Sequence, residues 1–152
     1  MMEGMTFMKI TINESEEIED IEIVVNCKRV DESILKMIAT VRAFDKKITG
    51  TKDGKLFVLD VDDIYYFESV DKRTYIYMGK DVYENTMRLY ELEEKFSNTD
   101  FFRASKSSII NLAKLKVITP IFGGKLEVIL ENDEKLIVSR QYVPLLKSKL
   151  NF

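Results

Sequence analysis

The chain has 152 residues, of which 45% are hydrophobic, 32% charged and 11% aromatic. This composition fits one globular domain, or one domain with a small extension, and excludes general disorder. No stretch approaches the roughly 20 consecutive apolar residues that cross a bilayer, and the N-terminus lacks a basic segment followed by an apolar core. We therefore expect a cytoplasmic protein with no membrane insertion.

Histidine is absent, which removes the commonest general acid or base, the commonest zinc ligand and every Ser-His or Cys-His nucleophile. The one cysteine, Cys27, excludes an internal disulfide and a multi-cysteine metal cluster. A lone cysteine is usually a small buried apolar residue, and we expect Cys27 to be one. We expect no metal and no cofactor.

The formal net charge of −3 is unevenly distributed along the chain. Residues 1–44 carry 9 acidic and 5 basic side chains (net −4), and residues 45–100 carry 13 and 9 (net −4). Residues 101–152 carry 4 acidic and 9 basic side chains (net +5). The last third is therefore the candidate for contact with phosphate.

Residues 1–44 are predicted to form a small ββα extension. Phe7–Ile12 and Ile21–Val25 alternate like strands, and Asp31 or Ser33 can cap a helix that reaches Phe44. So short a segment cannot build the five βα units of a phosphorylatable receiver domain. We expect it to pack on the following domain, form a dimer contact or hold a protein partner. The apolar positions of the helix follow three- and four-residue spacing: Ile34, Leu35, Ile38, Val41 and Ala43.

Residues 45–152 are predicted to form a mainly β domain. Two strands, Lys47–Lys52 and Lys55–Leu59, flank Asp53-Gly54, a typical two-residue type I′ hairpin turn. Another turn is expected at Asn132-Asp133. Further strands are predicted at Ile64–Ser69, Arg73–Met78, Val82–Glu84, Lys116–Ile121, Lys125–Leu130 and Leu136–Ser139.

Two helices complete the second predicted domain. Met87–Phe96 places Leu89, Leu92 and Phe96 on one face, which we expect to join the core. Val143–Leu150 forms a closing amphipathic turn. The fold class expected for the whole chain is therefore mainly β, α+β overall.

The segment Phe101–Leu112 reads FFRASKSSIINL, and from Phe102 it resembles the signature of LytTR DNA-binding domains. The strand Ile64–Ser69, followed by a polar loop and an aromatic strand, is also typical of that family. The resemblance covers roughly residues 45–150. A third matching segment follows downstream with the family's spacing: Gly124, Leu126, Val128, Leu130, Asn132, Leu136, Val138, Ser139, Arg140 and Tyr142.

The resemblance implies an elongated, mostly antiparallel β domain whose loops enter successive major grooves of double-stranded DNA. It implies a sequence-specific transcriptional regulator, here without the receiver domain that many relatives carry. Relatives that bind repeated half-sites suggest a homodimer on DNA. The residues implied to contact DNA are Lys72 and Arg73 in one loop, Arg103, Ser105, Lys106 and Ser107 in the second, and Arg140 and Gln141 in the third.

The chemistry of these residues agrees, because polar side chains that interrupt hydrophobic strands are costly to bury unpaired. Lys106 can donate to guanine or attract phosphate, and Arg140 can make a bidentate contact to guanine. Gln141 can do the same on adenine. Ser105 or Ser107 can donate to phosphate.

Ordinary structural roles are open for several of the same residues. Lys72 and Arg73 lie in a hairpin loop where charges are usually just solvated. Arg103 is equally compatible with an ion pair to Glu68 or to a neighbouring acid. Asn111 is expected to satisfy backbone groups where its strand ends.

Departures from the family pattern concern two positions. The family often has His-Arg or His-Lys where this chain has Ser105-Lys106, so its sequence preference can differ. Asp133 stands where a turn glycine is frequent, and Asp tolerates the left-handed conformation.

Two other functions fit parts of the sequence. The domain could be a protein interaction module that has lost DNA binding. It could also be a hydrolase using Asp60, Asp62 and Asp63, but adjacent carboxylates on a strand point to opposite faces. We therefore expect no enzyme.

Overall fold

The computed structural model describes residues 8–152. By its internal contacts the chain divides into two units, residues 1–37 and residues 38–152, and helix α1 (Glu32–Asp45) crosses the division. No helix in the described part of the chain is both long and apolar enough to span a bilayer.

The N-terminal segment lacks the two strands that its alternation predicted. Phe7 lies outside the described residues, and neither 8–12 nor 21–25 is a strand. None of the residues 8–37 is buried, and Ile21 is 96% exposed. The prediction was wrong because an isolated pair of strands is marginal in water without a third strand or a packed face. Cys27 is likewise exposed rather than buried.

The predicted helix is confirmed as α1. Its first turn is capped by Asp31, whose Oδ1 accepts hydrogen bonds from the backbone N–H of Ile34 (3.0 Å) and the hydroxyl of Ser33 (2.7 Å). No α1 residue is buried. The helix is therefore formed from local signals, without a covered apolar face.

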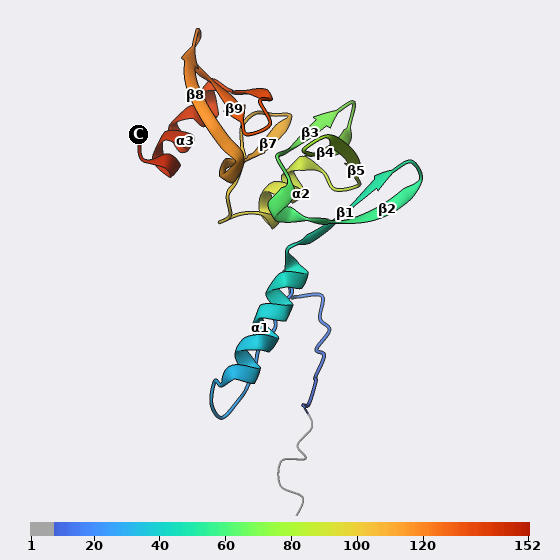
Figure 1. The fold of residues 1–152 in the computed structure, drawn as a ribbon. Coiled ribbons are helices and arrows are strands. Elements are labelled where there is room, and N and C mark those ends of the chain that lie inside the picture. Colours follow the sequence, from blue (N-terminus) through green and yellow to red (C-terminus); the bar gives the residue numbers. More distant parts are fainter. Residues whose placement is uncertain (1–7) are drawn as a thin grey trace, which may run out of the picture. The chain divides into compact units, whose positions relative to one another are not determined.

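The larger sheet, sheet A, has seven antiparallel strands in the order β2-β1-β5-β4-β3-β7-β6 (Figure 1). Asp53 (φ 52°) and Gly54 (φ 74°) link the first hairpin, which is the left-handed pair that a type I′ turn requires. The strands of sheet A are β1 (Lys47–Lys52), β2 (Lys55–Asp60), β3 (Tyr66–Val70), β4 (Arg73–Met78), β5 (Asp81–Asn85), β6 (Phe101–Arg103) and β7 (Ser108–Asn111).

The smaller sheet, sheet B, has three antiparallel strands in the order β10-β9-β8. They are β8 (Leu115–Ile121), β9 (Lys125–Leu130) and β10 (Lys135–Val138). Helices α2 (Leu89–Lys95) and α3 (Val143–Leu150) and three 3₁₀ turns, η1 (Val61–Asp63), η2 (Leu112–Lys114) and η3 (Arg140–Tyr142), complete the chain. Every strand predicted in residues 45–152 is present, with bounds that differ by no more than two residues.

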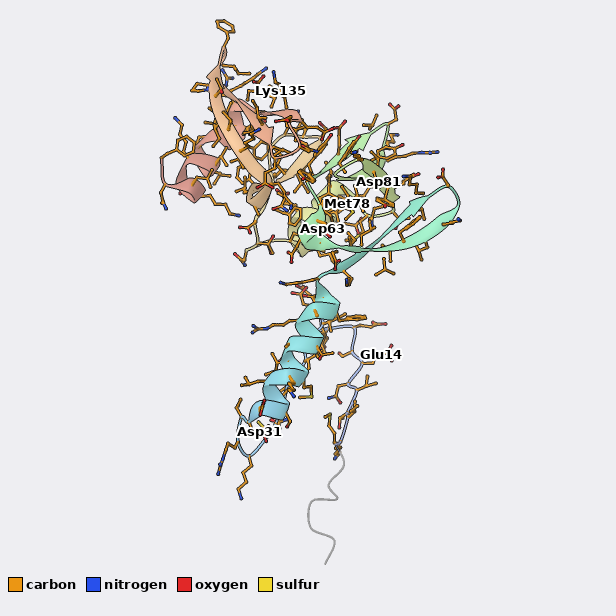
Figure 2. All side chains as sticks on the ribbon, in the orientation of Figure 1. Glu14, Asp31, Asp63, Met78, Asp81 and Lys135 are labelled. Atoms are coloured by element: carbon orange, nitrogen blue, oxygen red, sulfur yellow. The ribbon has the colours of Figure 1, made fainter. Side chains whose placement is uncertain are left out.

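Sheet A is covered on both faces at its central strands. Consecutive residues of a strand point to opposite faces, yet Tyr66 and Phe67 of β3 are both buried. Phe67 belongs to a core closed by Leu89, Leu92 and Phe96 around α2, as predicted. Figure 2 shows side chains filling these layers, with Met78 packed against the first core.

The second core lies between the other face of sheet A, sheet B and α3. Tyr66 packs here with Ile110 and Phe102 of sheet A. Sheet B and α3 supply the opposing side chains: Leu126, Val128, Leu130, Val138, Val143 and Leu146. Sheet A therefore fixes the position of sheet B, and through it the segment that follows β10.

Asn111 has the structural role expected of it. Its buried side chain donates to the carbonyl of Ile64 (2.8 Å) and accepts from the N–H of Ala113 (3.0 Å). These bonds satisfy backbone groups where β7 ends, so Asn111 links the end of β7 to the segment just before β3.

A carboxylate and two phenols meet beside the second core. The rings of Tyr66 and Tyr77 stack with centroids 4.2 Å apart. Burial, and then the negative charge of Glu134, raise the pKa of Glu68. Burial is also the main reason why the pKa values of Tyr66 and Tyr77 are raised. The folded protein therefore disfavours the charged form of Glu68.

Replacing Glu68 by Gln should stabilise the protein at neutral pH. Because the pKa of Glu68 is raised in the folded state, its neutral carboxyl is favoured there at low pH. As the pH rises through the folded-state pKa, the carboxylate becomes charged and this contribution to stability is lost. The gain of Glu68→Gln over the wild type should therefore be present at pH 7 and vanish well below pH 4.5. Urea unfolding at both pH values measures it. The exposed Glu131→Gln serves as control, and a less stable Glu68→Gln at pH 7 contradicts the reasoning.

Candidate nucleic-acid interface

The first candidate loop is the two-residue turn between β3 and β4. Asp71 (φ 50°) and Lys72 (φ 66°) both adopt the left-handed conformation, and Arg88 Nη1 donates to the carbonyl of Lys72 (3.3 Å). Arg73 Nη1 lies 3.9 Å from Glu84 Oε1, and its side chain is 67% exposed. The turn therefore holds Lys72 at the tip of the hairpin.

The second candidate loop, residues 104–107, is shaped by Arg103. The side chain of Arg103 is only 15% exposed. Its Nε donates to the carbonyl of Ser105 (2.6 Å) and its Nη2 to that of Lys106 (2.8 Å). Its Nη1 lies 3.4 Å from Glu93 Oε1. Arg103 therefore forms an ion pair, which was one of the two roles expected of it. Its partner is Glu93 and not Glu68.

Serine hydroxyls complete the second loop. The hydroxyls of Ser105 and Ser108 lie 2.8 Å apart, and Ser105 Oγ accepts from the N–H of Ser107 (3.2 Å). Lys106 and Ser107 themselves are exposed. The loop thus uses Ser105 internally and presents Lys106 and Ser107 to the surroundings.

The third candidate loop begins at Ser139, directly after β10. Ser139 donates twice to the carbonyl of buried Ala104, from its N–H (2.9 Å) and from its hydroxyl (3.3 Å). Arg140 and Gln141 follow in η3, and both are exposed. The third loop is therefore bonded directly to the second.

Backbone hydrogen bonds also join the first loop to the second. The N–H of Ser69, near the end of β3, donates to the carbonyl of Ser107 (2.8 Å). The three segments therefore follow one another along one end of the domain, which we call the loop rim: residues 71–73, 104–107 and 139–141 (Figure 1). Seven of the eight predicted residues lie on this rim, and Arg103 directly precedes its middle segment.

The charges on the loop rim differ in how they are engaged. Within residues 8–152, no carboxylate lies within ion-pair distance of Lys72, Lys106 or Arg140. Arg73 and Arg103, in contrast, each have an acidic partner. Lys72, Lys106 and Arg140 are therefore the cations available to an anionic ligand.

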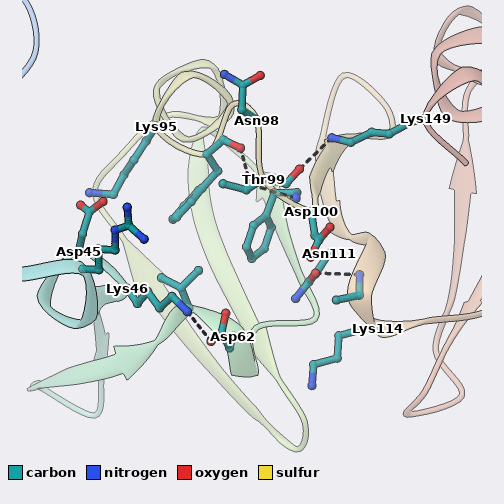
Figure 3. A pocket seen from close by; sticks show the side chains of 15 residues that line it. Asp45, Lys46, Asp62, Lys95, Asn98, Thr99, Asp100, Asn111, Lys114 and Lys149 are labelled. Carbon is teal, nitrogen blue, oxygen red and sulfur yellow. Dashed lines mark hydrogen bonds and ion pairs between the residues drawn. The ribbon is translucent and has the colours of Figure 1, made fainter. Parts of the chain in front are cut away.

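A depression at the end of sheet A opposite the loop rim contains none of the eight residues predicted to contact DNA (Figure 3). Lys46 lies 3.6 Å from Asp62 there, and Lys149 donates to the carbonyl of Thr99 (2.8 Å). Asp60, another of the three carboxylates weighed for a hydrolase, is bonded to Lys47. Lys46, Lys149 and Asp60 are thus engaged within the fold, and none of the residues predicted to contact DNA lies here, so the loop rim is the better candidate for a ligand.

Sequence reasoning missed the residues that hold the loop rim together. Ala104, Ser108, Ser139 and Ser69 carry no chemical signal in the sequence, since serine and alanine are frequent in any loop. Their contribution consists mainly of backbone bonds between segments far apart in the chain, together with the hydroxyl bonds of Ser108 and Ser139.

The fold and the loop rim define a class of protein, a β scaffold that presents cations on loops at one end. A model of the LytTr DNA-binding domain family matches residues 54–151. The chain belongs to this family, and the matched residues have the LytTr fold.

Relatives and a solved structure agree with the family. The sensory transduction protein LytT of Enterococcus faecalis is 34% identical over 98 residues, 64% of this chain and 40% of that protein. The transcriptional regulatory protein YpdB of Escherichia coli K12 is 33% identical over 106 residues, 69% of this chain and 43% of that protein. This chain therefore spans about two fifths of the length of those regulators.

Two further matches are a relative that aligns over most of its own length and a solved structure. An uncharacterized HTH-type transcriptional regulator of Staphylococcus aureus is 26% identical over 144 residues, 93% of this chain and 95% of that protein. A solved LytTr DNA-binding domain from Bacillus cereus, 23% identical, superposes with a TM-score of 0.67 over 70% of this chain and 98% of that chain. The latter supports the fold.

Replacing Arg103 by Lys should loosen the second loop. A lysine ammonium lacks the planar fork with which Arg103 reaches two carbonyls and Glu93. We expect a loss of about 1–2 kcal/mol in the free energy of unfolding, measured by urea titration. Arg73→Lys, at an exposed pair, should change it by less than about 0.5 kcal/mol. Equal effects of both substitutions would contradict the positioning role.

Proposed function

We propose that this protein is a sequence-specific regulator of transcription whose loop rim enters successive major grooves of double-stranded DNA. The observation that carries the proposal is the hydrogen-bonded continuity of three cation-bearing loops from chain positions far apart. Membership of a DNA-binding family supports the same ligand. The protein acts by binding, without catalysis or cofactor, and acts in the cytoplasm where bacterial DNA is found.

The predicted residues divide into two roles in this proposal. Lys106 and Arg140 read bases, because exposed Lys and Arg can donate to guanine O6 and N7 in the major groove. Lys72, Arg73, Ser107 and Gln141 contact phosphates or neighbouring base edges. Arg103 and Ser105 act chiefly by holding the second loop in shape, since their polar atoms are already bonded within it.

Lys106→Ala and Arg140→Ala should each cost about 1–3 kcal/mol of specific DNA binding while the fold survives. The duplex is one recovered by the wild type from a random pool at physiological salt. Lys135→Ala is the matched control, because exposed Lys135 (labelled in Figure 2) begins β10, at the end away from Ser139. Fluorescence anisotropy measures the affinities. Wild-type affinity in both variants would overturn the assignment of these two residues.

A salt titration separates DNA binding from the alternative of a protein interaction module. Neutralising several phosphates releases counterions, so the logarithm of the affinity should fall linearly with the logarithm of the salt concentration. A protein that does not bind DNA gives no such slope. That result would favour the interaction module.

The proposal includes a homodimer on repeated half-sites, joined through the acidic extension, residues 1–44. Ile21 and Ile23 are 96% and 64% exposed, and exposed apolar surface of this extent marks an interaction site. None of residues 8–37 is buried, so this segment builds no core of its own, and oligomerisation is a usual way for so short a segment to gain one. The similarity to the Staphylococcus aureus protein covers 93% of this chain, and so includes much of the extension.

Ile23→Lys should weaken association of two copies by at least about 10-fold, because a charge would remain unpaired in an apolar contact. Asn26→Lys adds the same charge nearby without removing an apolar side chain. Light scattering on a duplex with two half-sites measures the number of protomers bound. One wild-type protomer per such duplex, or equal effects of both variants, counts against dimerisation through the extension, which would then be free for another protein partner.

A further inference from the structure

The hairpin between β8 and β9 ends in a fully exposed aromatic residue. Ile121 pairs with Lys125, so the tip consists of Phe122, Gly123 and Gly124. The phenylalanine is 100% exposed. Both glycines adopt positive φ, 88° and 73°, which allows the chain to turn tightly beneath it. The tip therefore presents one phenyl ring to the surroundings.

No structural role accounts for Phe122. Burying a phenylalanine side chain gains about 1.5–3 kcal/mol, and this ring gains nothing from its own fold. It belongs to neither core cluster of the described residues and makes none of their ring contacts. Because aromatic side chains contribute strongly to binding interfaces, a fully exposed ring at a hairpin tip is well placed to be covered by a partner.

The tip continues the loop rim. A Cβ atom added to Gly124 would lie 3.2 Å from both Cγ and Cδ of Arg140, so the aliphatic part of Arg140 lies against the backbone of the tip. Leu126 pairs with Val138, which places this end of the hairpin beside the segment that begins the third loop. In Figure 1 the β8–β9 tip projects from the same side of the domain as the β3–β4 turn.

The charge around Phe122 favours DNA as the partner. Lys125, directly after the tip, is exposed, and the aliphatic part of Arg140 lies against Gly124 of the tip. No described acidic residue forms an ion pair with either cation. An exposed aromatic ring on a tip with two available cations nearby fits a polyanion with stacked, apolar bases.

We propose that Phe122 inserts into the minor groove that flanks the major-groove contact of Arg140, and partly unstacks one base step there. This proposal rests on the proposed DNA binding by the loop rim. Phosphates, and beyond them the minor groove, border any major-groove contact, and apolar wedges enter DNA through the minor groove. Lys125 then meets the flanking phosphates.

Insertion would add a preference outside the bases that the loops touch. Pyrimidine–purine steps such as TA and CA unstack most easily, so the wedge favours such a step at one fixed position beside the half-site. The preference would arise from deformability of the step and not from hydrogen bonds to its bases.

The test uses the full chain and the duplex recovered by selection, carrying 2-aminopurine at successive flanking positions. Wild-type protein should raise the fluorescence at one position, because unstacking relieves quenching. Phe122→Ala should abolish that rise and weaken binding about 10-fold, with an unchanged salt dependence because no phosphate contact is lost. Phe122→Leu, which keeps an apolar wedge, should retain most of both effects.

The control is Tyr90→Ala. Tyr90 is an aromatic residue of α2, 67% exposed, on the helix that closes the first core, and it belongs to none of the three segments of the loop rim. It should change neither affinity nor fluorescence. Equal affinity of Phe122→Ala and wild type, or a loss of affinity without any change at the flanking positions, overturns the insertion while DNA binding by the loops stands. Absence of salt-dependent binding by the wild type overturns both proposals.

Discussion

The candidate interface depends on a short set of hydrogen bonds around Ala104. Its carbonyl accepts from Ser139 after β10, and its N–H donates to Ser108 at the start of β7. Ser107, in the same loop, accepts from Ser69 at the end of β3. Because Ala104 is fully buried, these bonds are shielded from competing water. Three loops that carry cations therefore share one support.

The two-sided burial of sheet A is what makes this support possible. Side chains of β3 alternate between a core closed by α2 and a core closed by sheet B and α3. Sheet B is held against sheet A by Tyr66, Phe102 and Ile110, so the chain leaving β10 arrives beside the β6–β7 loop. The apolar interior thus positions polar loops that make few apolar contacts of their own, a common way for β scaffolds to carry function.

Arg103 shows how a residue of a binding motif can also hold its own loop in shape. Its position in the FFRASKSS segment suggested a phosphate or base contact, yet its guanidinium is engaged with two carbonyls of the loop and with Glu93. Lys106, three residues later, has no acidic partner within the described residues. The arginine orders the loop, and the lysine is left available. At the β8–β9 tip, the backbone of Gly124 lies against the aliphatic part of Arg140. Phe122, in the same tip, is fully exposed.

The sequence by itself determined strands β1 to β5 and β8 to β10, the Asp53-Gly54 turn and the core face of α2, because these follow from local alternation, turn chemistry and helical spacing. It also identified the loops that carry Lys72, Lys106 and Arg140. Only the tertiary structure decided that Arg103 pairs with Glu93, that Ala104 joins Ser139, and that the β8–β9 tip lies beside Arg140, since each depends on contacts between distant segments. In the extension, residues 8–12 and 21–25 alternate as strands do, yet they form no strand. A strand also needs a neighbour with which to pair, and local sequence does not supply one.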